Sequence, residues 1–214
     1  MPLVRVNNFA MSLDGFVAGP DQSQDNPLGR GGEQLHDWFV ETHNFRRMHG
    51  MDEGSVGIDN DFAAGGIDNV GAHIIGRNMF GPVRGAWPDE SWRGWWGEEP
   101  PYHHPVFVLT HHPREPLEMD GGTTFHFVSD GIEAALSRAR EAAGDHDVII
   151  GGGAMTVREY LDADLIDQMH LAVAPVLLGG GERLFEGIEL ADRFDFEPVQ
   201  SSSGAAHFVL RRRA

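Results

Sequence analysis

The sequence predicts an α/β protein: a three-layer, mostly parallel mixed sheet with helices on both faces and a C-terminal antiparallel hairpin. Strand-like apolar runs alternate with helix-like segments along most of the 214 residues, an order typical of parallel sheets covered on both faces. The run Val148-Ile149-Ile150 leads through three glycines into a helix-like segment. Two final strand-like runs are joined by Ser201-Ser202-Ser203-Gly204, and this arrangement predicts the hairpin.

Strands are expected where short apolar runs are bounded by loop residues. In chain order these runs are residues 3–9, 72–75, 106–110, 124–128, 147–150, 168–178, 194–200 and 207–211. The run at 168–178 is stopped by Gly179-Gly180-Gly181, and the last two runs form the hairpin.

Helices are expected where apolar residues recur at intervals of three and four. They are predicted over residues 33–45, from Asp59 toward Val70, over 130–143 and over 156–161. Leu35, Trp38 and Phe39 give the first helix its apolar stripe, and Ile132 and Leu136 contribute to that of the third. The second begins at an aspartate, a residue type suited to capping a helix N-terminus.

The composition limits what the chain can bind. The formal net charge is −17, and the sequence contains neither lysine nor cysteine. The negative charge disfavours nucleic acids and anionic membranes as partners, and the absence of cysteine excludes disulfides and thiolate metal sites. No apolar run approaches the ~20 residues of a membrane helix, and the N-terminus lacks a signal-peptide layout. We therefore expect a single cytoplasmic domain over residues 1–214.

The glycine run Gly151–Gly153, followed by Ala154, is the strongest candidate for a binding loop. Glycines lack Cβ atoms, so a ligand can approach the backbone closely. The helix that follows directs its unpaired N–H groups and its positive dipole end at the same place, which favours an anion such as a phosphate. The alternative is a tight strand-to-helix turn without a ligand.

Other candidates directly follow predicted strands, where ligands bind in open α/β sheets. They are Asp14, Gly76, Arg77, Thr110, His111 and Gly179–Gly181. We expect these positions and the glycine run to face one cleft. Arg77 and the nearby Arg114 are candidates for clamping the 2′-phosphate of NADPH, since guanidinium groups bind phosphates through paired donors. The alternative for each is a solvated surface arginine.

Asp14 has two possible roles. It is either a turn aspartate that caps its neighbours, or a group that binds a polar heterocycle or a water for proton delivery. A catalytic acid here would need its pKa raised by burial. No metal site is expected from His103-His104 or His111-His112, because adjacent side chains point in different directions. The tryptophan-rich loop over residues 85–97 is expected to pack on the core, with a lid or a subunit contact as the alternatives.

Five segments together resemble the dihydrofolate-reductase-like superfamily, in the branch that contains the reductase domain of the bifunctional riboflavin-biosynthesis protein. These segments are residues 11–18, 75–80, 106–110, 148–153 and 175–181. The resemblance implies bound NADPH, hydride transfer to a planar heterocycle and a homodimer. It also implies that Gly76-Arg77 and Thr110-His111 hold the adenosine-phosphate side, that Gly151–Ala154 hold the pyrophosphate, and that Asp14 faces the substrate or the nicotinamide.

Two departures from the family pattern concern the substrate. The zinc deaminase half of the bifunctional protein is absent, and Phe16 stands where the reductase domain often has lysine. For the buried acid of true dihydrofolate reductase, Asp37 and Glu41 are the candidates. The expected function is an NADPH-dependent reductase of a pyrimidine- or pterin-like heterocycle, resembling 5-amino-6-(5-phosphoribosylamino)uracil reductase. The alternatives are a non-catalytic nucleotide-binding module and a true dihydrofolate reductase.

Overall fold

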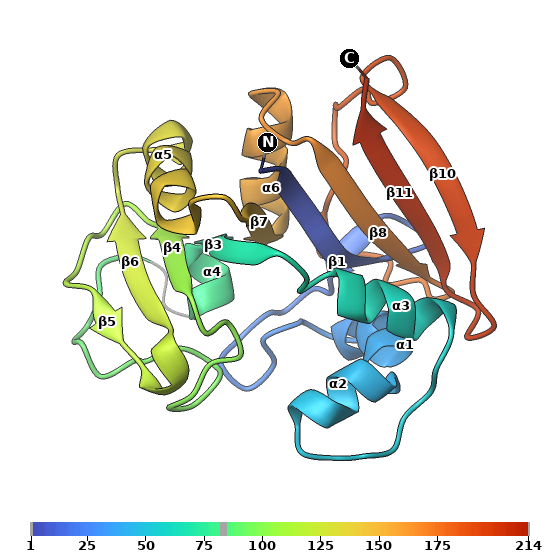
Figure 1. Cartoon of the computed structure of the whole chain (residues 1–214), viewed down its shortest axis with the longest axis horizontal. Coiled ribbons are helices and arrows are strands. Elements are labelled where there is room, and N and C mark those ends of the chain that lie inside the picture. Colours follow the sequence, from blue (N-terminus) through green and yellow to red (C-terminus); the bar gives the residue numbers. More distant parts are fainter. Residues whose placement is uncertain (1, 82–84, 214) are drawn as a thin grey trace. The chain divides into compact units, whose positions relative to one another are not determined.

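A computed structural model describes residues 2–81 and 85–213, and Figure 1 traces its elements. The chain divides into two compact units. The first contains the residues up to Arg5 together with Asn69–Ile166, and the second contains Val6–Asp68 together with the residues from Asp167 onward. The organisation of residues 1–214 as one domain stays a prediction. Among the described residues, no helix has both the length and the apolar character needed to span a membrane.

The first unit is built on a mostly parallel sheet. Its strands lie in the order β7 (Asp147–Gly152), β3 (Val70–Gly76), β4 (Pro105–Leu109), β6 (Thr124–Val128) and β5 (Leu117–Glu118). All neighbours are parallel except β5, which runs antiparallel to β6. The first residues of β1 (Val4–Ser12) also pair in parallel with β7. Adjacent Ile74 and Ile75 are both 0% exposed, so both faces of β3 are covered.

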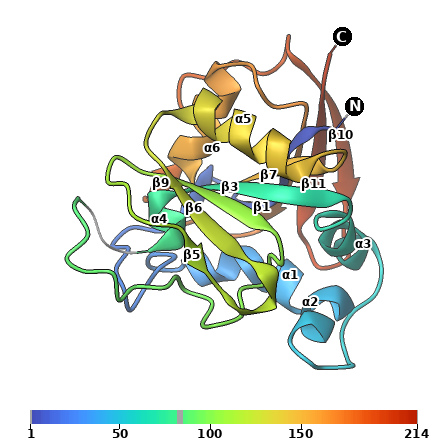
Figure 2. The same cartoon turned by 60° about the vertical axis from the view of Figure 1, so that its left-hand side comes forward.

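Helices cover this sheet on both faces, as predicted. Helix α5 (Ile132–Ala143) packs across β3, β4 and β7, and α6 (Ala154–Asp162) packs on β7 and β3. The short helix α4 (Arg77–Phe80) follows β3, and Figure 2 shows α4 and α5 on opposite sides of that strand. On the α4 side, a buried cluster includes Phe80, and Trp87, Trp92 and Trp96 pack against it. Packing of the tryptophan-rich loop is therefore confirmed.

The second unit holds the predicted C-terminal hairpin. Its main strands lie in the order β10 (Phe194–Gln200), β11 (Ala206–Arg212), β8 (Gln168–Ala174) and β1. Strand β11 runs antiparallel to both β10 and β8. A separate antiparallel pair joins β2 (Phe16–Ala18) to β9 (Glu182–Arg183). These two strands were not predicted, because two or three residues carry no readable alternation. Strand β8 ends earlier than predicted, directly before Pro175, which lacks a backbone N–H for pairing.

The predicted helix over 33–45 is wrong. The structure has a 3₁₀ helix (Gly32–His36), α1 (Asp37–Val40) and α2 (His43–Met48) in its place. Thr42 causes the break. Its backbone is extended, its hydroxyl donates to the Phe39 carbonyl at 2.7 Å, and it accepts from the Phe45 N–H at 3.2 Å. The hydroxyl thus caps α2, a role that competes with a continuous helix.

The predicted capping role of Asp59 is also wrong. Helix α3 (Ile58–Gly65) has Gly57 at its N-cap, and Asp59 lies in the first turn. The Asp59 carboxylate instead accepts a hydrogen bond from His207, which is far away in the sequence.

Candidate functional site

In the first unit, the glycine-rich turn between β7 and α6 lies against the turn between β3 and α4. Ile75 pairs with Gly152 across the two strands. A Cβ atom on Gly76 would lie 2.5 Å from the Thr156 hydroxyl oxygen, so a larger residue there would force the Thr156 side chain to shift. Gly152 has a φ of 126° and precedes a cis peptide bond to Gly153. Two predicted phosphate-binding segments are therefore neighbours.

Gly153 differs from the other glycines of this turn. Apart from its own and its two neighbouring residues, no described residue has an atom within 4 Å of the position that a Cβ atom would occupy. Its φ of −76° is one that any residue adopts. Its carbonyl accepts the N–H of Val157 at 3.1 Å. The N–H groups that precede Val157 in α6 belong to the first turn, where the helix itself offers them no acceptor. The protein itself does not require a glycine at this position, but a ligand lying against the helix N-terminus would.

Arg77 is the first residue of α4, and one edge of its guanidinium has no partner. Its Nη1 donates to the Thr110 hydroxyl oxygen at 3.2 Å. Nε and Nη2 are shielded from solvent, and neither forms a hydrogen bond with any described residue. These two atoms share the edge that binds two oxygens of a phosphate or carboxylate at once. Because shielded donors without partners are costly and rare, this edge is suited to a bound anion.

The charge of Arg77 is not neutralised by any described carboxylate, since no described residue forms an ion pair with it. Burial, followed by the charge of the nearby Arg114, lowers the pKa of its guanidinium to about 10. Arg77 is therefore still a cation at neutral pH. A local positive charge of this kind lets a protein of net charge −17 hold an anion.

Arg114 lies close by but is engaged differently. Its Nη1 and Nη2 donate to the backbone oxygens of Trp92 and Glu90, each at 3.0 Å. Burial lowers its pKa, while the charges of Glu90 and Asp89 act in the opposite direction. Because two of its donor groups already hold the loop, its direct contact with a phosphate stays a prediction.

The two residues predicted after β4 are placed differently. Thr110 is buried, and its hydroxyl oxygen accepts from both Arg77 and the His112 N–H. His111 is exposed. The structure thus joins Gly76, Arg77, Thr110 and the glycine turn in one unit, and the role of His111 stays a prediction.

Asp14 belongs to the second unit, with the loop that contains Gly179–Gly181. One carboxylate oxygen accepts from the Ser12 hydroxyl at 2.6 Å and from the Leu178 N–H, and the other accepts from the Gly179 N–H at 2.7 Å. The Ser12 bond, followed by these backbone donors, lowers the pKa of Asp14 to about 2. A catalytic acid needs the opposite shift. The carboxylate is therefore ionised and holds a loop, and the catalytic role expected for Asp14 stays a prediction.

The two candidates for a buried acid are also corrected. Asp37 and Glu41 are both exposed, and Glu41 pairs with Arg46 at the surface. The buried acid of this part of the chain is Asp59. Its surroundings were not predicted from the sequence.

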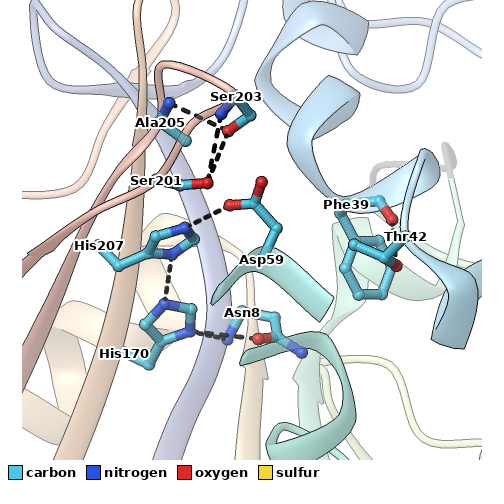
Figure 3. A network of polar contacts seen from close by, with 9 residues as sticks. All are labelled: Asn8, Phe39, Thr42, Asp59, His170, Ser201, Ser203, Ala205 and His207. Atoms are coloured by element: carbon cyan, nitrogen blue, oxygen red, sulfur yellow. Dashed lines mark hydrogen bonds and ion pairs between the residues drawn. The ribbon is translucent and has the colours of Figure 1, made fainter. Parts of the chain in front are cut away.

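Asp59 ends a buried chain of hydrogen bonds in the second unit (Figure 3). It accepts from His207 Nε2 at 2.8 Å, and His207 Nδ1 lies 2.9 Å from His170 Nε2. His170 Nδ1 accepts from the Asn8 backbone N–H at 3.2 Å. The ring of Phe62 stacks on both imidazoles. The chain thus connects α3, β11, β8 and β1. Its four members are distant in the sequence, and the only sequence signal is a polar residue on each of three apolar strands.

The buried histidine predicts how stability depends on pH. Burial, followed by the neighbouring His207, lowers the pKa of His170 from 6.5 to about 3. Below pH 6.5 the unfolded chain takes up this proton and the folded chain does not, so stability falls by up to about 1.4 kcal/mol per pH unit. Urea denaturation from pH 7 to pH 4 is expected to show this loss, with a shallower slope for His170→Gln. Equal slopes for the two proteins would contradict the account.

The sheet topology is that of an α/β protein with a dihydrofolate reductase-like fold. The chain belongs to the RibD C-terminal domain family, whose model matches residues 2–209. It is 36% identical over 178 residues to the uncharacterized protein YwjB of Bacillus subtilis, covering 83% of this chain and 79% of YwjB.

Solved structures share the fold. A putative riboflavin biosynthesis protein from Shewanella sp. PV-4 aligns over 100% of both chains, with 24% identity and a TM-score of 0.57. Dihydrofolate reductase from Enterococcus faecalis, solved in complex with NADP(H) and RAB-propyl, has 14% identity and a TM-score of 0.55. That alignment covers 100% of this chain and 97% of the other.

Proposed function

We propose that this protein is an NADPH-dependent reductase that transfers a hydride to a planar pyrimidine- or pterin-like heterocycle. The observation that carries the proposal is the unpartnered edge of Arg77, shielded from water beside the paired glycine turns. Membership of the RibD C-terminal domain family and the reductase-type fold support the same function. A cytoplasmic location and a homodimer stay predictions.

The residues of the first unit fit the phosphates of such a cofactor. Gly151–Gly153 and Ala154 offer bare backbone and the N-terminus of a nine-residue helix to the pyrophosphate. Nε and Nη2 of Arg77 would bind two oxygens of the 2′-phosphate, with Thr110 holding the third nitrogen. When bound, NADPH supplies the hydride, and the protein supplies its orientation. Arg77 is thus the residue that would distinguish NADPH from NADH.

Asp14 has a different part in the proposal. Ionised and fixed by Ser12, it holds the Leu178-Gly179 backbone in place. We therefore assign it the positioning of this loop at the substrate end rather than proton donation. A solvent proton completes the reduction in this scheme.

The reductase is tested by mixing the protein with NADPH and a panel of oxidised pterins and pyrimidines, while following the absorbance of the reduced nicotinamide. Oxidation that depends on one class of acceptor is the expected result. Binding of NADPH without turnover on any acceptor would favour the second candidate, a non-catalytic nucleotide-binding module. The low pKa of Asp14 is the observation that favours this candidate, because an ionised carboxylate has no proton to donate.

A variant at Gly153 tests the pyrophosphate site. Gly153→Ala adds a methyl group at a position that, beyond the adjacent residues, has no atom of the described part of the chain within 4 Å. We expect unchanged thermal stability without ligand. Binding of both NADPH and NADH is expected to be about tenfold weaker, because the methyl group would occupy the space that the pyrophosphate needs. Gly152→Ala is the matched control: at a φ of 126° it is expected to destabilise the fold itself. Unchanged nucleotide affinity in Gly153→Ala would exclude this turn as the pyrophosphate site.

A further inference from the structure

We infer that Trp87 is a positioning residue that makes the Arg77 site selective for a phosphate monoester. Its indole face carries the Arg77 guanidinium and holds the unpartnered edge ready for the ligand. The inference rests on the proposed function, because it assigns to Trp87 the selectivity of that site for the 2′-phosphate. The tryptophan-rich loop thus has a role beyond packing.

The Trp87 ring is fixed from several sides. Its Nε1 donates to the His112 backbone oxygen at 2.7 Å. The rings of Phe80 and Phe127 meet it in edge-on geometry, with centroid distances of 5.9 and 5.6 Å. An indole anchored by a hydrogen bond and two aromatic rings forms a rigid surface.

The Arg77 guanidinium lies over this surface. Its Cζ atom is 3.0 Å from the centroid of the Trp87 ring. A stacked guanidinium keeps its N–H groups in its own plane, so stacking leaves its edges free for hydrogen bonds. One nitrogen is used by Thr110, and the Nε and Nη2 edge remains. Trp87 and Thr110 together therefore fix the direction of that edge, which lowers the entropy lost when a ligand binds.

A second cation lies on the same ring. The Cζ atom of Arg114 is 5.1 Å from the Trp87 centroid and 5.0 Å from that of Phe127. Because the backbone oxygens of Trp92 and Glu90 occupy its Nη1 and Nη2, Arg114 contributes charge more than hydrogen bonds. Two guanidinium groups at one indole favour a dianion over a monoanion. A phosphate monoester carries the second charge near neutral pH, and a phosphodiester does not.

The test compares NADPH and NADH binding by isothermal titration in three variants. Trp87→Leu removes the aromatic surface, and Trp87→Phe keeps a ring face. Trp96→Leu is the matched control, because Trp96 packs on the same cluster through Phe125 and Tyr102, and the cation–π contacts of Arg77 and Arg114 found among the described residues are made to Trp87 and Phe127. We expect Trp87→Leu to reduce the preference for NADPH about tenfold through weaker NADPH binding alone. Trp87→Phe and Trp96→Leu are expected to keep most of the preference.

Each other outcome is informative. If Trp87→Leu keeps the wild-type preference, Trp87 only packs the loop, and the proposed function stands without this inference. If Trp96→Leu loses the preference equally, the effect belongs to loop packing, and the inference fails in the same way. If the wild-type protein shows no preference for NADPH, the proposed function and this inference both fail.

A spectroscopic measurement tests the same geometry without any nucleotide. A guanidinium centred over an indole face is shielded by the ring current, so the Arg77 Nε–H proton is expected at unusually high field in the wild-type protein. Trp87→Phe is expected to keep part of this shift even if Trp87→Leu does not fold. An Arg77 Nε–H resonance at the usual position of an exposed arginine in the wild-type protein would overturn the inference.

Discussion

Arg77→Gln is expected to weaken NADPH binding about 100-fold, which corresponds to about 2.7 kcal/mol. The glutamine removes the cation and the paired donors at Nε and Nη2, which no described protein group uses. NADH lacks the 2′-phosphate, so its affinity is expected to change by no more than about threefold. Isothermal titration of both nucleotides with the variant measures the two effects separately.

The control for this variant is Arg138→Gln, which removes a cation from the surface of the same unit. Arg138 is half-exposed and pairs with Asp130, so its removal is expected to leave the affinities of both nucleotides nearly unchanged. Equal losses of NADPH and NADH affinity in Arg77→Gln would show that Arg77 acts on the fold of the site or on the pyrophosphate instead. An unchanged NADPH affinity would remove Arg77 from the site.

Asp59→Ala is expected to destabilise the protein by about 3 kcal/mol. The change leaves the buried His207 Nε2 without its partner and opens the chain of hydrogen bonds that joins α3 to three strands. Asp59→Asn keeps an acceptor oxygen and is expected to lose much less. Urea denaturation followed by tryptophan fluorescence is a suitable measurement, because the buried Trp38 contacts the His207 ring.

Asp61→Ala provides the matched control for Asp59. Both aspartates lie in the first turn of α3, but Asp61 is exposed. Any effect on the helix dipole is therefore shared, and only the buried contact differs. We expect Asp61→Ala to change stability by less than about 0.5 kcal/mol. Equal losses of stability in the two variants would show that Asp59 acts only through its charge at the helix N-terminus.

The regular parts of the fold could be predicted from the sequence because their signals are local. Strands β6 and β10 begin and end at the predicted residues, and the hairpin follows from its turn. The helix predicted over 33–45 failed because one hydroxyl, that of Thr42, prefers to cap α2. The spacing of apolar residues does not show whether a threonine continues a helix or caps the next one. Strand pairs as short as β2 and β9 depend on tertiary contacts that spacing does not show either.

The candidate site was predictable to the extent that it follows strand ends. Gly76, Arg77, Thr110 and the glycine turn meet because their parallel strands are neighbours in the sheet. The place of Trp87 beneath Arg77 depends on how an irregular loop folds back. The lowered pKa of Asp14 comes first from the Ser12 hydroxyl and then from N–H donors of a loop more than 160 residues away, and spacing in the sequence shows none of these bonds. The buried chain from Asn8 to Asp59 depends on four distant residues, which no local pattern connects.

The most direct measurement is the affinity of the wild-type protein for NADPH and NADH, determined side by side by isothermal titration. An anion-binding edge at Arg77 predicts that NADPH binds at least about tenfold more tightly, and that adding salt reduces this advantage. Equal affinities, or no binding of either nucleotide, would contradict the assignment of this glycine turn and this arginine to a phosphorylated dinucleotide.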